Sequence, residues 1–245
     1  MVSNKLINLD EIVLTYTVDE FSTSLGIDSF AHCQDKTHYN AWTKLIIYKF
    51  NSLGYRDEEW PDDVEHAVWC FGDSFTLGIG QAQEDTWHQL VQSKLASRVI
   101  NISMNGASNT WIGRRAKFVL ENFNPTAILI QWSYVHRRED PDTTKPDELR
   151  ALNFDPNDLA DFENLTANIM LLESIKGSSK IVHSFIPKFF DSAVDINKAT
   201  ELYQTLSAKN VLYFEPPEQT DFARDGHHYD VATATQYADR YTKLL

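Results

Sequence analysis

The sequence predicts a three-layer α/β domain, in which a parallel sheet has helices on both faces. From residue 65 onward, short apolar runs alternate with longer segments whose apolar residues recur at helical spacing, and the apolar runs are continuous. Continuous apolar runs indicate strands that are buried on both faces, and a helix between successive strands makes those strands parallel. The chain has 245 residues, of which 42% are hydrophobic, so it can build one such domain with a sizeable core.

Each expected element follows from its local pattern. The expected strands are apolar runs that end at glycine, proline or polar residues, and they span 66–74, 98–109, 125–133, 179–187 and 210–217. The expected helices place apolar residues three and four positions apart, and they span 85–97, 110–123, 159–177, 196–210 and 231–245. Residues 1–60 have a less regular pattern, and we expect them to form an N-terminal extension that packs on the main domain, residues 61–245.

Charge and cysteine content narrow the class of protein. The formal net charge of −13 repels phosphate backbones and anionic lipid headgroups, so it disfavours binding to nucleic acids and to membrane surfaces. The sequence shows neither an export signal nor an apolar run long enough to span a membrane, so a cytoplasmic location is expected.

The two cysteines, Cys33 and Cys70, indicate a reducing compartment, with one disulfide between them as the alternative. The oligomeric state is left open.

Three polar loops follow predicted strands, at Gly72–Ser74, Asn105–Asn109 and Asp221–His228. The carboxyl ends of parallel strands meet at one edge of a sheet, which is where ligands bind in such folds. A serine hydroxyl becomes a nucleophile when a histidine takes its proton and a carboxylate orients that histidine. Asp225 and His228 are three positions apart, so a tight turn can point both side chains to one side.

Two other interpretations of these loops stay open. Ser74 can be a polar residue that only caps a turn between a strand and a helix. The pair His227 and His228 can instead bind a metal ion together with an aspartate: Asp221, Asp225 or Asp230. Metal ligands usually come as three or four groups at recognisable spacing, and no second cluster of that kind stands out. The pattern therefore favours Ser74 with Asp225 and His228, and no metal.

The order and spacing of these motifs resemble a known family. Gly72-Asp73-Ser74, Gly106 and Asp225-Gly-His-His228 together resemble the SGNH (GDSL) hydrolase superfamily over roughly residues 65–245. The resemblance implies a flavodoxin-like α/β esterase that needs no cofactor. It further implies that Ser74 is the nucleophile, His228 the general base and Asp225 its orienting acid. The backbone N–H groups of Ser74 and Gly106 would then donate to the oxyanion.

The chain departs from the family pattern after the middle strand. The family supplies a third oxyanion donor there, an asparagine in a Gly-x-Asn-Asp block, whereas this chain reads "IQWSYVHRRE" over 130–139. Ser133 stands closest to the expected position, and Asn109 or Arg137 can reach in from neighbouring loops. Outright loss of one oxyanion donor costs about 10²–10³ in rate. A protein of this fold that binds or supports structure with little turnover is therefore an alternative.

The substrate is expected to be a small acyl ester, first of all an O-acetylated carbohydrate. The segment "NSLGYRDEEW", 51–60, is similar to one found in some relatives that act on acetylated carbohydrate. Trp132 and Tyr134 can stack on sugar faces, although core packing is the alternative for Trp132. Arg137 near the site would suit an anionic substrate. An ester of a lipid, or a thioester, is the other substrate class.

Overall fold

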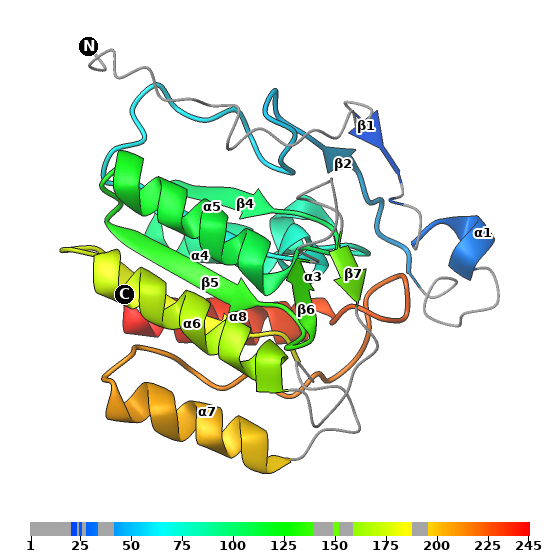
Figure 1. Cartoon of the computed structure of the whole chain (residues 1–245). Coiled ribbons are helices and arrows are strands. Elements are labelled where there is room, and N and C mark those ends of the chain that lie inside the picture. The colour runs from blue at the N-terminus through cyan, green and yellow to red at the C-terminus, as the bar shows by residue number, and fades with distance from the viewer. Residues whose placement is uncertain are drawn as a thin grey trace.

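The computed structural model confirms the predicted α/β fold (Figure 1). The structure describes residues 21–23, 25, 28–33, 42–139, 149–151, 159–187 and 196–245. Four parallel strands form the central sheet in the order β4-β3-β5-β8. In chain order they are β3 (Val68–Gly72), β4 (Val99–Ser103), β5 (Ala127–Trp132) and β8 (Lys180–Phe185). Every residue of β3, β4 and β5 is buried, which explains why these strands are mostly apolar.

An extended segment lies beside β8 where a fifth strand was expected. His183 N donates to Leu212 O at 2.9 Å and Phe214 N donates to His183 O at 3.1 Å, which makes a single parallel bridge between His183 and Tyr213. The expected strand 210–217 is thus reduced to one bridge. With this segment added, the spatial order of the strands is that of flavodoxin-like sheets.

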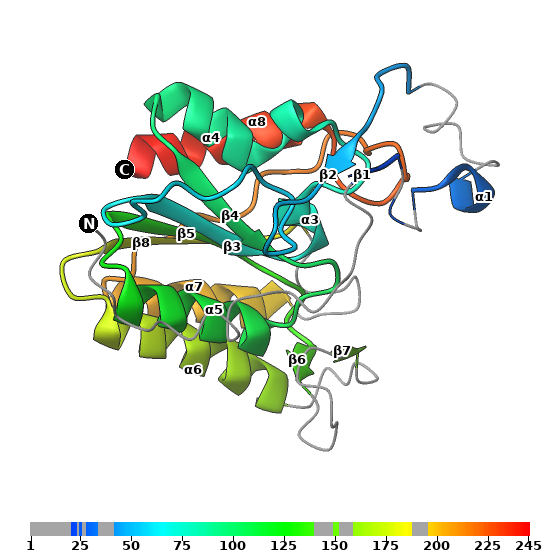
Figure 2. The same cartoon turned by 90° about the horizontal axis from the view of Figure 1, so that it is seen from above.

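Helices cover both faces of the sheet (Figure 2). On one face lie α4 (Trp87–Leu95) and α8 (Val231–Leu244), and on the other lie α5 (Asn109–Asn122), α6 (Leu159–Ile175) and α7 (Ile196–Ala208). The five expected helices all form, with boundaries shifted by a few residues at most. None of the helices in these described ranges is long and apolar enough to cross a membrane. No disulfide joins Cys33 and Cys70, so that alternative is not realised.

Short elements gather at the end of the molecule to which the strands point (Figure 1). They are β1 (Phe21–Ser22), α1 (Phe30–Cys33), β2 (Tyr48–Lys49), α3 (Ser74–Leu77), β6 (Arg137–Glu139) and β7 (Leu149–Ala151). A 3₁₀ turn, η2 (Gln83–Asp85), precedes α4. Strands β1 and β2 pair with each other, as do β6 and β7, and both pairs are antiparallel. This end of the sheet is where a ligand site is expected in a parallel α/β fold.

The chain before β3 is joined to the outer edge of β4. Asn101 N, in the middle of β4, donates to Asp57 Oδ2 at 2.9 Å, and Asn101 Nδ2 donates to Arg56 O at 3.1 Å. Arg98 forms an ion pair of 2.8 Å with the same Asp57 carboxylate, which is completely buried. These contacts satisfy polar groups at the edge of the sheet. The boundary at residue 60 between an extension and a main domain stays a prediction.

Candidate active site

Ser74 is positioned by the end of β3. The strand ends at Gly72, Asp73 follows as the N-cap of α3, and Ser74 is the first residue of that helix. Asp73 Oδ1 accepts from Phe75 N at 2.9 Å, the bond typical of an N-cap. A Cβ on Gly72 would lie 2.0 Å from Thr76 Oγ1, so a glycine is required for the chain to turn so tightly into the helix. Ser74 is only 4% exposed.

His228 and Asp225 reach Ser74 from the loop before α8. His228 Nε2 lies 2.8 Å from Ser74 Oγ, and His228 Nδ1 lies 2.6 Å from Asp225 Oδ2. The other carboxylate oxygen of Asp225 accepts from the backbone N–H groups of His227 and His228, each at 3.1 Å. Asp225 is therefore fixed by its own turn, and in turn it fixes the orientation of the imidazole. Ser74, Asp225 and His228 come together as the sequence motifs led us to expect.

The electrostatics of this trio suit proton transfer from the serine. Burial raises the pKa of the Asp225 carboxyl, but the hydrogen bonds and charge of His228 and the two backbone donors outweigh it and hold that pKa below its ordinary value. An ionised Asp225 keeps a proton on His228 Nδ1, which leaves Nε2 with a lone pair directed at the Ser74 hydroxyl. The arrangement can therefore remove the Ser74 proton and stabilise the imidazolium that results.

The backbone N–H group of Ser74 and that of Gly106, in the loop after β4, are both available to a ligand. Met104 N donates to Gly72 O at 3.2 Å, which holds the loop after β4 against the end of β3. Gly106 in this loop has φ of 75°, a left-handed conformation that glycine adopts without strain. Neither the Ser74 N–H nor the Gly106 N–H donates to another group in the described part of the chain. Both can donate to a developing oxyanion.

Asp73 links the serine turn to the loop after β5. Its Oδ2 accepts from Ser133 Oγ at 2.5 Å and from Arg137 Nη1 at 3.2 Å. The Arg137 guanidinium also lies over the Tyr134 ring, 4.9 Å from the ring centroid. Asp73 is completely buried, whereas the Arg137 side chain is 22% exposed. Sequence reasoning missed this cluster because Asp73 and Ser133 are 60 positions apart and share no local pattern.

Comparisons with known proteins identify the fold. No protein-family model and no curated protein matches the sequence. Among solved structures, a Desulfitobacterium hafniense DCB-2 protein assigned to the G-D-S-L lipolytic family is 14% identical, with a TM-score of 0.52, over 74% of this chain and 100% of that chain. TesA is 18% identical, with a TM-score of 0.53, over 73% of this chain and 97% of that chain. The chain has the SGNH hydrolase fold.

A third similar structure is a carbohydrate esterase. It is a family-two carbohydrate esterase from Clostridium thermocellum in complex with cellohexaose, 15% identical, with a TM-score of 0.50, over 76% of this chain and 65% of that chain. At identities this low, the three comparisons show a shared fold alone. The reaction has to be argued from the side chains.

Within the SGNH hydrolase fold, two of the three candidates for a third oxyanion donor are occupied. The Ser133 hydroxyl proton is committed to the Asp73 carboxylate. Asn109 Oδ1 accepts from Ser133 N at 3.0 Å and Asn109 Nδ2 donates to Tyr134 O at 2.9 Å, so its amide holds the loop after β5. Arg137 uses only Nη1 in hydrogen bonds to described residues, and its other N–H groups remain available.

The aromatic candidates for substrate binding are placed differently from one another. Trp132 is completely buried, its Nε1 donates to His183 Nδ1 at 3.0 Å and its ring stacks on that histidine. This placement fits the core-packing alternative for Trp132. Tyr134 is half-buried and packs edge-on against Phe75, the residue after the serine, with 6.3 Å between ring centroids. Tyr134 and Arg137 are thus the expected substrate contacts that the structure leaves partly accessible.

His227 makes no hydrogen bond to Ser74, and its ring centroid lies 5.8 Å from that of Phe75. Its ring is perpendicular to that of His228, with 5.0 Å between centroids, and its side chain is exposed. The alternative of a metal site depended on the two histidines converging with an aspartate. In the described ranges, no three His, Cys, Asp or Glu side chains are grouped closely enough to hold a metal ion.

Proposed function

We propose that this protein is a serine esterase that hydrolyses a small acyl ester through an acyl-enzyme. The observation that carries the proposal is the continuous hydrogen-bonded chain Ser74–His228–Asp225, with bonds of 2.8 and 2.6 Å, at the carboxyl ends of the strands. Nearly complete burial of all three side chains strengthens their interaction, because few waters compete for it.

The reaction follows from this geometry in two halves. As Ser74 Oγ bonds to the ester carbonyl carbon, His228 Nε2 takes its proton, and the imidazolium then gives that proton to the departing alcohol oxygen. A water next enters, Nε2 takes one of its protons, and the resulting hydroxide attacks the acyl carbon. The C–O bond to Ser74 breaks and Oγ recovers the proton from Nε2. Asp225 remains ionised and stabilises the imidazolium in both halves.

The tetrahedral oxyanion needs donors on the other side of the carbonyl. We assign the backbone N–H groups of Ser74 and Gly106 to this role, because both are unused by described residues and lie on adjoining loops. Arg137 supplies the third donor in place of the family asparagine. Its guanidinium is bound to Asp73, the residue before the nucleophile, and keeps N–H groups for a ligand. A fixed charge of this kind stabilises a developing negative charge more than it stabilises the ground state.

An O-acetylated carbohydrate is the substrate class that we favour. Tyr134 packs edge-on against Phe75, the residue after Ser74, so it places an aromatic side chain near the serine, and aromatic side chains can pack against sugars. The Clostridium thermocellum esterase of similar fold was solved with cellohexaose, which supports the same class here. The substrate is tested by comparing acetate release from acetylated xylo-oligosaccharides with hydrolysis of a long-chain p-nitrophenyl ester and an acyl thioester. A higher kcat/KM on the long-chain ester or the thioester would contradict the carbohydrate assignment.

The reaction is tested by hydrolysis of p-nitrophenyl acetate. We expect the wild type to turn over and the variants Ser74→Ala and His228→Ala to lose at least about 10³-fold in kcat, because each removes a group that no neighbour replaces. His227→Ala is the matched control, since His227 has no hydrogen bond to the serine, and it should keep most of the activity. Mass spectrometry should find a fluorophosphonate adduct on Ser74 alone. One shared background rate and no adduct would contradict the proposal and favour a binding protein on this fold.

A further inference from the structure

The distance between Ser74 and His228 depends on two separate loops. The nucleophile loop, residues 74–81, follows β3, and the acid–base loop, residues 221–229, precedes α8. The two loops belong to opposite ends of the domain sequence, and a hydrogen bond of 2.8 Å must form between them. Displacement of either loop by about 1 Å would cost as much as 10²-fold in rate. Contacts between the two loops must therefore keep Ser74 and His228 at hydrogen-bonding distance.

A closed ring of hydrogen bonds joins the two loops through the N-terminal segment. Gly80 N donates to Tyr48 Oη at 2.8 Å, and Tyr48 Oη donates to Asp28 Oδ2 at 2.5 Å. The same carboxylate oxygen accepts from Arg224 Nη2 in an ion pair. Arg224 N then closes the ring by donating to Gly80 O at 3.2 Å. Gly80 belongs to the nucleophile loop, and Arg224 immediately precedes Asp225.

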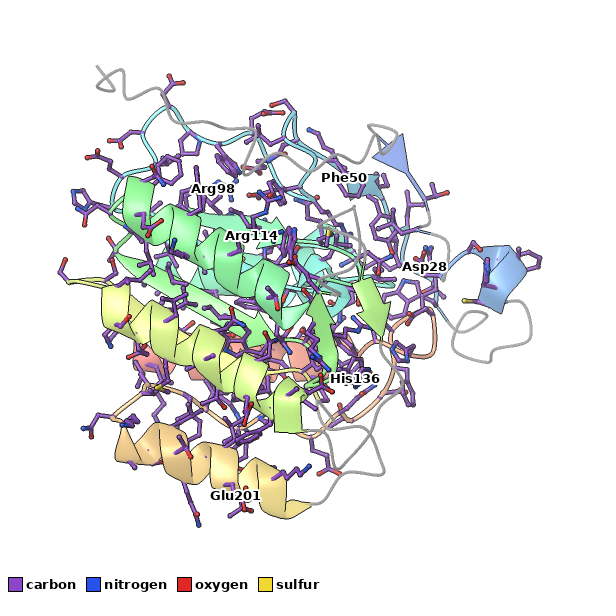
Figure 3. The ribbon with its side chains drawn as sticks, in the orientation of Figure 1. Asp28, Phe50, Arg98, Arg114, His136 and Glu201 are labelled. Atoms are coloured by element: carbon purple, nitrogen blue, oxygen red, sulfur yellow. The ribbon has the colours of Figure 1, made fainter. Side chains whose placement is uncertain are left out.

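The ring is buried, so its bonds are not readily exchanged for water. Asp28 and Tyr48 are completely buried and Arg224 is 8% exposed. Burial raises the pKa of the Tyr48 phenol, which therefore keeps its proton and donates it to Asp28. Separating Asp28 from Arg224 would leave a charge buried without its partner, which is strongly unfavourable. In Figure 3, Asp28 lies beside the loop that precedes α8, at the end to which the strands point.

Close backbone contact makes this arrangement sensitive to small shifts. A Cβ on Gly80 would lie 2.9 Å from Ala223 Cβ and 3.1 Å from Arg224 N, so the loops touch with no space between them.

Arg56 holds the nucleophile loop from the same N-terminal segment. Its buried guanidinium donates to the carbonyl oxygens of Leu77, Gly78 and Gln81 at 2.9, 2.6 and 2.8 Å.

We infer that Asp28 and Tyr48 are positioning residues, which fix the acid–base loop against the nucleophile loop and so set the Ser74–His228 geometry. The N-terminal segment is then part of the catalytic apparatus without touching substrate. This inference rests on the proposed function, because it concerns the rate of the step that Ser74 and His228 perform.

The test compares Asp28→Asn and Tyr48→Phe with the wild type in p-nitrophenyl acetate hydrolysis. Tyr48→Phe removes both ring bonds of the Tyr48 hydroxyl, and Asp28→Asn removes the charge that pairs with Arg224. Both variants should lower kcat by about 10- to 100-fold with KM within about threefold of wild type. The downfield proton resonance of the His228 Nδ1–H···Asp225 hydrogen bond should weaken or shift in both. Asp57→Asn is the matched control, because Asp57 is a buried, ion-paired carboxylate of the same segment that bonds to β4 instead of to the two loops.

The outcomes separate the inference from the proposed function. Thermal unfolding of each variant shows which are folded, and Tyr48→Phe, which alters no charge, keeps the test valid if Asp28→Asn does not fold. A lower kcat in the folded ring variants, with Asp57→Asn unaffected, supports the inference. If the ring variants keep kcat within twofold of wild type and an unchanged proton resonance, the positioning role of Asp28 and Tyr48 is wrong. Ser74 labelling of the wild type would still support the esterase in that case. Absence of Ser74 labelling in the wild type overturns both.

Discussion

At the scale of single residues, Asp73 connects Ser74, the proposed nucleophile, to the loop after β5. One oxygen caps α3 and the other accepts from Ser133 and Arg137. Both partners bind the same buried carboxylate, but only Arg137 keeps N–H groups for a ligand. We therefore expect Arg137→Met to lower kcat for p-nitrophenyl acetate by about 10²–10³-fold, the usual cost of one oxyanion donor.

Ser133→Ala is the matched control for Arg137→Met. It removes the other side-chain hydrogen bond to Asp73 Oδ2, so it should lower the free energy of unfolding by about 1–3 kcal/mol and kcat by less than about tenfold. Steady-state kinetics and urea unfolding of both variants measure these effects. If Ser133→Ala lost as much kcat as Arg137→Met, the third oxyanion donor could no longer be assigned to Arg137 over Ser133, and our assignment of Arg137 would be wrong.

At the scale of elements, local pattern predicted the helices and the four main strands but not what their side chains contact. Strands β3, β4 and β5 are buried on both faces, so apolar residues fall on either face and the pattern does not tell the two faces apart. The sequence therefore left open whether Trp132 faced the site or the core. Its partner, His183, lies 51 positions away on the adjacent strand β8, and the pairing becomes visible only when the two strands align.

The site was predictable to the extent that its chemistry is local. Asp225 and His228 share one turn, and Ser74 begins the short helix after β3, so residue type and spacing, together with the family resemblance, were enough to propose all three. The hydrogen bonds of Ser133 and Asn109 could not be inferred in the same way. Each is made by a side chain that can serve several roles, and the loop conformation after β5 decides which one.

At the scale of the whole molecule, the N-terminal segment is more closely integrated than its irregular sequence indicated. Arg56 is completely buried and binds carbonyl groups rather than a carboxylate, while its guanidinium lies 4.2 Å from the Tyr48 ring centroid. Burial lowers the pKa of Arg56 to about 10, so it remains charged at neutral pH. A buried polar side chain such as that of Arg56 adds nothing to the apolar periodicity from which helices and strands are predicted. Its structural role becomes visible only from its hydrogen bonds to residues distant in the sequence.

The stability of the whole molecule should fall in mild acid because of a buried histidine. His88 in α4 is completely buried, and its Nε2 lies 3.0 Å from Thr86 Oγ1, which itself donates to Gln83 O. His88 Nε2 is therefore the donor, and Nδ1 has no hydrogen-bond partner among the described residues. Protonation would place an unpaired N–H and a charge in the core, and burial accordingly lowers the pKa of His88 to about 3.

The sign of the pH effect follows from the proton count of the two states. Below pH 6.5 the unfolded chain protonates His88 while the folded protein does not, so stability declines as the pH falls from about 6.5 toward 3. Between pH 7 and pH 5 this single group should cost about 2 kcal/mol of unfolding free energy. Burial lowers the pKa of His183 as well, which adds a loss of the same sign.

Urea unfolding at pH 7 and pH 5 measures this loss in the wild type and in His88→Gln. Glutamine keeps an N–H donor for Thr86 and carries no titrating proton, so the variant should lose about 2 kcal/mol less than the wild type over the same interval. His66→Asn is the control, because His66 is exposed and its φ of 62° is one that asparagine tolerates. An equal pH dependence in His88→Gln and the wild type would show that His88 is already protonated, or accessible to protonation, in the folded protein.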